Sequence, residues 1–199
     1  MKKEIILGTA QFGMNYGVTN TKGKVRKNEA LNIFKLASNL GIKTLDTAQD
    51  YGEAEDLIGG SKSIKSYFKI NTKIIFDEVE INSKFPLSSM DTKLKKSLKC
   101  LRTNYLNSLM IHNGSKLNIN SNGLIDWFKN CKKQNIIQSF GASIYQDTFL
   151  PERILKELDF VQIPFSLLNS EVEKNGIVKL CLENNVQIHV RSIFCQGIL

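Results

Sequence analysis

The feature that most restricts the fold of this chain is a regular alternation of short apolar segments with longer amphipathic ones. The short segments have the length and composition of buried strands, and the longer ones repeat apolar residues at helical spacing. Strands that alternate with helices are typical of βαβ units, and therefore of an α/β fold with a parallel sheet. The predicted strands cover residues 5–7, 42–45, 67–75, 108–111, 137–141, 160–163 and 187–190, and the predicted helices cover 28–40, 53–58, 89–101, 123–133, 151–158 and 171–184.

Seven such strands suit a TIM barrel, the (β/α)8 fold, that is incomplete. A full barrel typically takes about 250 residues, whereas this sequence has 199 and ends just after the seventh predicted strand, so we expect the last β/α unit to be missing. No linker, low-complexity tract or repeat of fixed period divides the chain, which predicts one domain over residues 1–199. An open, doubly wound sheet is the alternative, although the Gly-x-Gly-x-x-Gly turn of dinucleotide-binding sheets is absent.

The net charge of +8 is compatible with an anionic partner such as nucleic acid, or with a solvated surface. The densest basic cluster, residues 93–102, shares its segment with leucines at helical spacing, which favours the solvent-exposed face of a helix. Because no nucleic-acid motif accompanies the cluster, we expect no nucleic-acid partner.

Cysteines and histidines are few and scattered. The four cysteines form no Cys-x-x-Cys pair and there are two histidines, so we expect neither a zinc site nor a disulfide framework. No apolar run is long enough for a transmembrane helix, and no charged-then-apolar leader follows Met1. These observations predict a cytoplasmic protein without a membrane partner.

Residues 44–55 pass from a short apolar strand through a polar loop into the start of a helix. Asp46 closes the strand and Tyr51 follows five residues later. A barrel that keeps its chemistry at the carboxyl ends of its strands would place both side chains in its mouth. Lys73, in the third predicted strand, and His112, at the end of the fourth, would lie at the same end of the barrel.

These motifs, taken in this order, resemble those of the aldo/keto reductase family. The resemblance covers nearly the whole chain, and it is the main reason to prefer a barrel over an open sheet. It implies an NADPH-dependent enzyme, with NADH as the alternative cofactor, that interconverts a small aldehyde or ketone and its alcohol. The matching segments are Leu-Gly-Thr-Ala-Gln-Phe-Gly (7–13), Leu-Asp-Thr-Ala (45–48) with Tyr51, Gly52 and Glu55, Lys73, Ile-His-Asn (111–113), Gly-Ala-Ser (141–143), Val-Gln-Ile-Pro (161–164) and Val-Arg-Ser (190–192).

The resemblance assigns a catalytic tetrad to Asp46, Tyr51, Lys73 and His112. Tyr51 would donate the proton, and His112 would orient the substrate carbonyl. A free tyrosine, with a pKa near 10, holds its proton tightly, and a nearby ammonium such as that of Lys73 would lower that pKa. Taken one at a time, each of the four residues also has an ordinary structural interpretation; their joint occurrence favours the tetrad.

The cofactor positions implied by the resemblance are less uniform. Ser143 and Gln162 match residues that hydrogen-bond the nicotinamide carboxamide, although Ile144 stands where many members carry asparagine. Gly8 and Thr9 would approach the nicotinamide from the first strand. Arg191 and Ser192 occupy the place of a Tyr-Ser pair whose ring stacks on the nicotinamide, and a planar guanidinium can also stack. The family's segment for the adenosine phosphate has no counterpart.

Two further expectations concern partners and substrate. An unpaired strand edge beside the first strand predicts self-association or poor solubility. The stretch 164–169 and the last residues look like a bacterial subgroup associated with cell-surface carbohydrate synthesis, which makes a keto or aldehydo sugar derivative a candidate substrate. The alternative is a truncated chain that binds cofactor weakly and serves as a binding or assembly subunit, or has no function.

Overall fold

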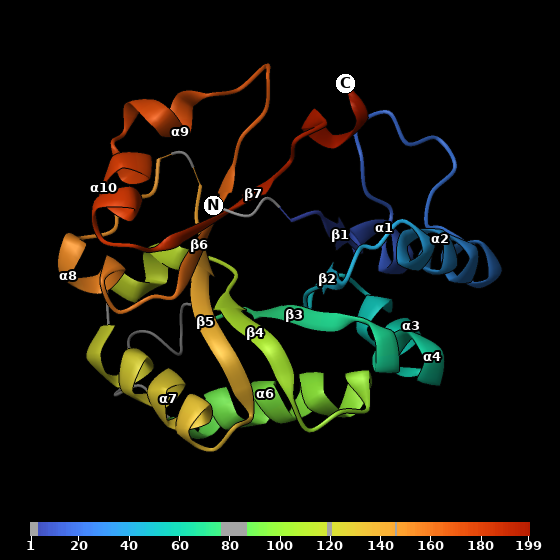
Figure 1. Ribbon diagram of the computed structural model, residues 1–199, viewed down its shortest axis with the longest axis horizontal. Helices are drawn as coiled ribbons and strands as arrows, with labels where there is room; N and C mark the ends of the chain where they lie inside the picture. Colours follow the sequence, from blue (N-terminus) through green and yellow to red (C-terminus); the bar gives the residue numbers. More distant parts are fainter. Residues whose placement is uncertain (1–3, 77–86, 119–120, 146) are drawn as a thin grey trace.

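The computed structural model describes residues 4–76, 87–118, 121–145 and 147–199. In these ranges seven parallel strands form one sheet, and their order in the sheet is their order in the sequence. The sheet curls, and helices lie along its outer side (Figure 1). The strands are β1 (Ile6–Gly8), β2 (Thr44–Asp46), β3 (Lys69–Ile74), β4 (Leu106–Ile111), β5 (Ile137–Ser143), β6 (Phe160–Pro164) and β7 (Gln187–Arg191).

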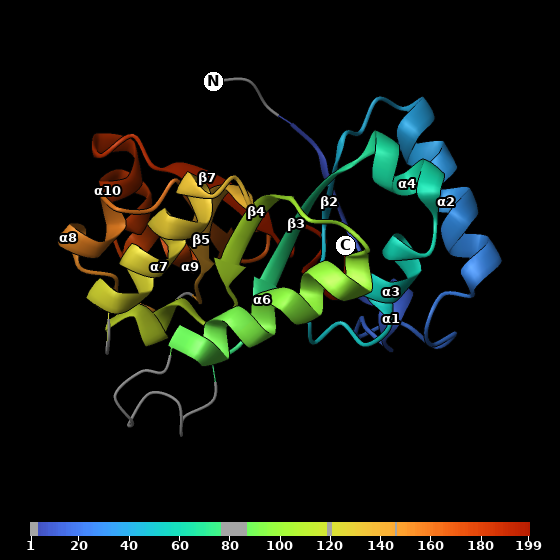
Figure 2. The same ribbon diagram turned by 90° about the horizontal axis from the view of Figure 1, so that it is seen from below.

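The helices follow the strands along the chain. Seen from below, α6 and α7 run along the outer side of the central strands (Figure 2). In the described ranges the helices are α1 (Ala10–Gly13), α2 (Lys27–Asn39), α3 (Ala54–Gly59), α4 (Lys62–Tyr67), α6 (Leu87–Leu101), α7 (Ser121–Lys133), α8 (Glu152–Leu155), α9 (Glu171–Lys174) and α10 (Ile177–Glu183), with 3-10 turns η1 (Gly114–Asn118) and η2 (Cys195–Gly197). No helix among these residues has the length and apolar character needed to cross a bilayer.

The strand order confirms the prediction of an incomplete barrel. A doubly wound sheet reverses its strand order at a switch point, whereas here each strand from β2 to β6 pairs with its two neighbours in sequence. Strands β1 and β7 end the sheet and do not pair with each other. They are also more exposed than β3 to β6, whose residues are mostly buried.

Two predicted elements differ in the structure. The third strand does not begin at Tyr67, because residues 62–67 form α4 and β3 begins at Lys69. The helix predicted over 171–184 is two helices, α9 and α10, separated at Gly176. This glycine has a left-handed φ of 78°, which glycine adopts without a steric penalty. The side chain of Asn175 then accepts a hydrogen bond from the Ile177 amide at the start of α10.

The hydrophobic core lies between the sheet and its helices. Phe140 of β5 stacks on Phe128 of α7, with ring centroids 4.9 Å apart and planes 5° from parallel. Phe12 of α1 packs edge-on against Phe34 of α2 at 4.9 Å. Aromatic pairs of this kind add to the stabilisation from apolar burial. Apolar side chains on the outer face of the strands therefore pack against the helices, and the polar side chains described below lie on the concave side.

The chain after β7 returns to the first loop of the molecule. The Val18 amide donates to the Gln196 carbonyl at 3.0 Å, and the Thr19 hydroxyl donates to the Gly197 carbonyl at 3.0 Å. The two ends of the sheet are therefore joined at the mouth by loop contacts although β1 and β7 are unpaired.

Glu55 is a buried carboxyl that should make stability depend on pH. It is 4% exposed, accepts a hydrogen bond of 2.6 Å from the Thr72 hydroxyl, and its pKa is raised mainly by burial. Folding therefore favours the protonated form, so its contribution to stability is complete below the unfolded pKa and is lost as the pH rises through the folded pKa. We expect Glu55→Gln, which keeps an acceptor for Thr72, to flatten the rise in unfolding free energy toward acidic pH.

Urea unfolding of Glu55→Gln and the parent protein between pH 4 and pH 8 tests this expectation. Glu183→Gln, on the exposed end of α10, is the matched control. Stability curves of Glu55→Gln and the parent that stay parallel over the whole range would show that burial of Glu55 does not perturb its titration.

Candidate functional site

The loop after β2 is held against β3 and α1. The amides of Thr47 and Gln49 donate to the carbonyls of Asn71 and Lys73 at 2.9 and 3.1 Å, so the loop extends the pairing of β2 with β3. A Cβ atom at Gly13 would lie 1.6 Å from the Tyr51 carbonyl oxygen. This contact requires glycine, and it brings the Tyr51 backbone directly against α1.

Asp46 and Lys73 form an ion pair inside the curled sheet. Lys73 Nζ lies 2.6 Å from Asp46 Oδ2 and donates a second hydrogen bond, of 3.0 Å, to the Thr47 carbonyl. The Lys73 side chain is fully buried and that of Asp46 is 14% exposed. From β6 on the far side of the interior, Gln162 Nε2 donates to Asp46 Oδ1 at 3.3 Å. Side chains of β2, β3 and β6 thus meet at one point.

Tyr51 and His112 complete the group that the sequence predicts. Their rings meet edge to face with centroids 5.9 Å apart, and Lys73 Nζ lies 4.9 Å from the centre of the Tyr51 ring. The His112 amide continues β4 by donating to the Ile74 carbonyl at 2.9 Å. The structure therefore brings Asp46, Tyr51, Lys73 and His112 together at the carboxyl ends of β2, β3 and β4.

Asp50 is a site residue that the sequence reasoning missed. Its Oδ1 lies 3.0 Å from His112 Nδ1, and its side chain is 39% exposed. The signal was present, because Asp50 immediately precedes Tyr51 in a loop already assigned to the mouth. The two atoms are within ion-pair distance, although Nδ1 makes no hydrogen bond within the described ranges.

The pKa of Tyr51 moves in the direction opposite to the one expected from the sequence. It is raised above its ordinary value, first by burial of the phenol and then by the carboxylates of Asp46 and Asp50, while Arg191 opposes the shift. The expected lowering by Lys73 is outweighed by burial of the phenol and by the negative charges of Asp46 and Asp50. In the structure the Lys73 ammonium is engaged by Asp46. The phenol of Tyr51 is therefore protonated throughout the neutral range.

The predicted cofactor residues lie at the same end of the sheet. Thr9 is fully buried and its hydroxyl donates to the Asp46 carbonyl at 3.0 Å, while Gly8 ends β1 with open space where a Cβ would project. Ser143, 1% exposed, pairs in register with Gln162. Within the described ranges the Gln162 Oε1 atom is buried and accepts no hydrogen bond. A carboxamide N–H₂ group is a donor that would satisfy this atom.

Arg191 and Ser192 lie at the end of β7. Arg191 donates to the Ile144 carbonyl at 3.2 Å and to the Ser192 hydroxyl at 3.3 Å, and its guanidinium carbon lies 4.9 Å from the Tyr145 ring centre. In this structure the aromatic ring that Arg191 faces is therefore that of Tyr145. Ser192 has a positive φ of 59°, a turn that ends the strand.

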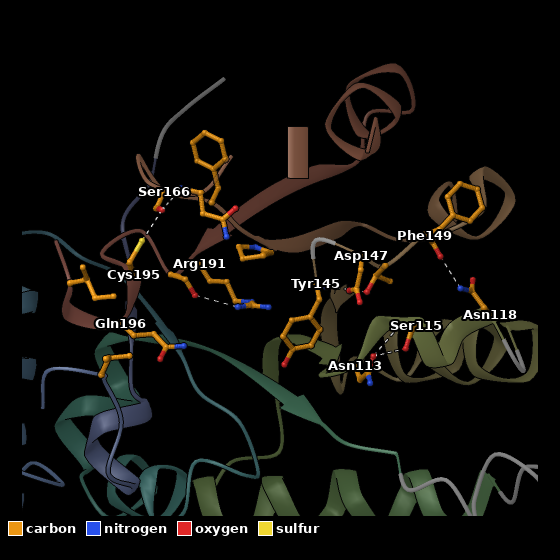
Figure 3. Close-up of a pocket in the computed structure, with 17 residues that line it drawn as sticks. Asn113, Ser115, Asn118, Tyr145, Asp147, Phe149, Ser166, Arg191, Cys195 and Gln196 are labelled. Atoms are coloured by element: carbon orange, nitrogen blue, oxygen red, sulfur yellow. Dashed lines mark hydrogen bonds between the residues drawn. The ribbon is translucent and has the colours of Figure 1, made fainter. Parts of the chain in front are cut away.

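Two cavities open at this end of the sheet. The smaller one, of about 580 Å³, lies between β1 and β7 and is bordered by Thr9, Asp46, Tyr51 and Gln162. The larger one, of about 950 Å³, lies over the ends of β4 to β7 and is shown in Figure 3. Both are bordered by Arg191, Ser192 and Gln196, whereas Ser143 borders neither.

His189 of β7 packs against the neighbouring strand β6. Its ring stacks on Phe160 with centroids 4.3 Å apart and planes 17° from parallel. Burial lowers its pKa, so that the neutral form is favoured.

Comparisons with known proteins identify the family of this chain. The profile of the Aldo/keto reductase family matches residues 4–199. An uncharacterized oxidoreductase of Bacillus subtilis, YqkF, is 27% identical over 181 residues, which are 87% of this chain and 58% of that protein. The chain thus spans less than two thirds of this relative.

Solved structures share the fold. The holo form of the aldo-keto reductase AKR11C1 from Bacillus halodurans superposes with a TM-score of 0.77 at 22% identity, over 98% of this chain and 64% of that one. An aldo-keto reductase from Klebsiella pneumoniae in complex with NADPH gives a TM-score of 0.74 at 16% identity, over 96% and 64% of the two chains. From the family match and the shared architecture we conclude that this chain belongs to the aldo/keto reductase family.

Proposed function

We propose that this chain is an NADPH-dependent reductase that converts a small aldehyde or ketone to its alcohol. The observation that carries the proposal is the meeting of Asp46, Tyr51, Lys73 and His112 at the strand ends, where Asp46 and Tyr51 border the smaller cavity. A phenol, an imidazole and an ammonium–carboxylate pair at one point are the groups that proton delivery to a carbonyl oxygen requires. We also propose that the protein is cytoplasmic.

Each member of the tetrad has its own role in carbonyl reduction. The Tyr51 hydroxyl donates its proton to the carbonyl oxygen as negative charge develops there. His112, whose Nδ1 lies 3.0 Å from Asp50 Oδ1, orients the carbonyl. Lys73 lies under the Tyr51 ring and is fixed there by Asp46, so its positive charge offsets the phenolate left after proton transfer.

The residues at the ends of β1, β5, β6 and β7 fit a nicotinamide cofactor, which supplies the hydride when bound. Gln162 would accept a hydrogen bond from the carboxamide through its unsatisfied Oε1 atom, with Ser143 beside it. Gly8 and Thr9 would border the ring from β1, and Arg191 with Ser192 would close the site from β7. The NADPH complex of the Klebsiella relative supports NADPH, and NADH is the alternative.

Nucleotide binding is the experiment that tests the proposal. The Trp127 indole N–H donates a hydrogen bond to Asp91, and Trp127 borders neither cavity. The fluorescence of the bound nucleotide is therefore a better signal of binding than tryptophan fluorescence. We expect saturable micromolar binding of NADPH, retained in Tyr51→Phe and weakened in Gln162→Leu. A carbonyl screen that includes keto and aldehydo sugars should then give turnover. Absence of binding at millimolar nucleotide would reject the reductase and leave a binding or assembly subunit.

The unpaired edges of the sheet favour that second candidate, and they predict self-association. Ile5 and Val190 are 72% and 43% exposed beside β1 and within β7. Exposed strand edges pair with other chains, and a lysine on the edge discourages pairing. We expect the sedimentation coefficient to rise with protein concentration, and Val190→Lys to reduce the rise. Leu182→Lys, on α10, is the control. A monomer at every concentration would contradict the expectation.

A further inference from the structure

Arg191 stands where the two cavities meet. It is the last residue of β7 and borders both the cavity that contains Tyr51 and the larger one beside it. Figure 3 shows its side chain reaching across the floor of the larger cavity toward Tyr145. A charged group in this position can reach a molecule whose reacting end lies at the tetrad.

The guanidinium is held in place by uncharged groups. The Ile144 carbonyl and the Ser192 hydroxyl accept one hydrogen bond each, and the Tyr145 ring covers one side of the planar group. A guanidinium has five N–H donors, so these bonds leave several of them available. Tyr145 is 49% exposed, which keeps this corner of the cavity open to an entering molecule.

No carboxylate of the described residues forms an ion pair with Arg191. Two acids border the cavities among the described residues. Asp46 is paired with Lys73, and Asp147 of the larger cavity is solvent-exposed and forms no ion pair with the guanidinium. A half-buried cation without a counter-charge is unfavourable until an anion neutralises it. Arginine binds carboxylate and phosphate oxygens in a bidentate manner, which adds geometric selectivity.

We infer that Arg191 binds an anionic group of the substrate, a carboxylate or a phosphate, while the carbonyl of the same molecule lies against Tyr51 and His112. The inference rests on the proposed function and narrows it to oxo acids and phosphorylated aldehydes or ketones. It gives Arg191 a task that an aromatic residue at the end of β7 cannot perform.

Ligand binding without nucleotide tests the inference apart from turnover. The probes are two matched pairs, levulinate with 2-pentanone and dihydroxyacetone phosphate with dihydroxyacetone, measured by calorimetry on the full chain. We expect at least one anion to bind ten times or more tightly than its neutral partner. Arg191→Gln should remove the tighter binding of the anion and leave the affinity for the neutral ketones unchanged. Arg191→Lys should retain part of the anion's advantage. Arg102→Gln, an exposed site outside both cavities, is the control for net charge.

The carboxylate and phosphate pairs identify which anion the site prefers. Equal affinities within both pairs, or an anion advantage that survives in Arg191→Gln, would overturn the inference. A loss of NADPH binding in Arg191→Gln with no change for either anion would assign the residue to the cofactor, and would also overturn it. Failure of NADPH to bind the parent protein rejects the proposed reductase, and the anion pairs report on Arg191 even then.

Discussion

Replacing Tyr51 with phenylalanine should lower the rate of carbonyl reduction by about a hundred- to ten-thousand-fold, the usual contribution of a positioned proton donor. The ring contacts with His112 and Lys73 do not involve the hydroxyl, so phenylalanine can keep them. The loss should therefore appear in kcat, with nucleotide affinity nearly unchanged. The loss of NADPH absorbance with time, measured for parent and variant at saturating nucleotide, gives the ratio.

Tyr145→Phe is the matched control, because this tyrosine lies in the larger cavity and outside the tetrad. Its ring can still face Arg191 after the hydroxyl is removed. Turnover by Tyr51→Phe within a factor of three of the parent would mean that another group delivers the proton. The thermal melting curves of the two variants establish that folding is not the cause of any loss.

Replacing Lys73 with methionine should lower the free energy of unfolding by about 3–5 kcal/mol, because it leaves one partner of a buried ion pair without its counter-charge. The Lys73 side chain is fully buried, and Asp46 is left with the hydrogen bond from Gln162. Methionine fills a similar volume, so the loss comes mainly from charge. Urea unfolding at neutral pH measures the difference.

The double variant Asp46→Asn/Lys73→Met separates charge from packing. It removes both members of the pair, and we expect it to be more stable than Lys73→Met alone. Lys132→Met is the control, since its ion pair with Asp159 is partly exposed and a change of less than about 1 kcal/mol is expected. A Lys73→Met variant as stable as the parent would show that Asp46 is well solvated.

The strands and helices could be predicted from the sequence because apolar and amphipathic segments alternate so regularly, whereas the barrel order of the strands was expected from the family resemblance. The errors fell where local backbone conformation decides the structure. Tyr67 lies next to an apolar strand and was predicted as its first residue, although it is the last residue of α4. Gly176 ends one helix and allows the next to begin, and helical periodicity on both sides concealed the break.

The family resemblance assigned Asp46, Tyr51, Lys73 and His112 to one group, and the structure brings these four residues together. What the sequence could not give is the balance of charge around Tyr51. The pKa depends on how deeply the phenol is buried and on two carboxylates, and these distances exist only in the folded chain. The contact of Arg191 with Tyr145 could not be predicted either, because it joins the end of β7 to the loop after β5, which are far apart in the sequence.

The position of each strand in the sheet also makes one part of the site more resistant to local unfolding than the other. Asp46, Lys73 and His112 belong to strands or strand ends with neighbours on both sides, whereas Gly8, Thr9, Arg191 and Ser192 belong to the two edges. Amides of the edge strands should exchange with deuterium well before those of β3 and β4. Warming the protein should then release a bound nucleotide while the proton-transfer group is still assembled, so that affinity and chemistry fail at different temperatures.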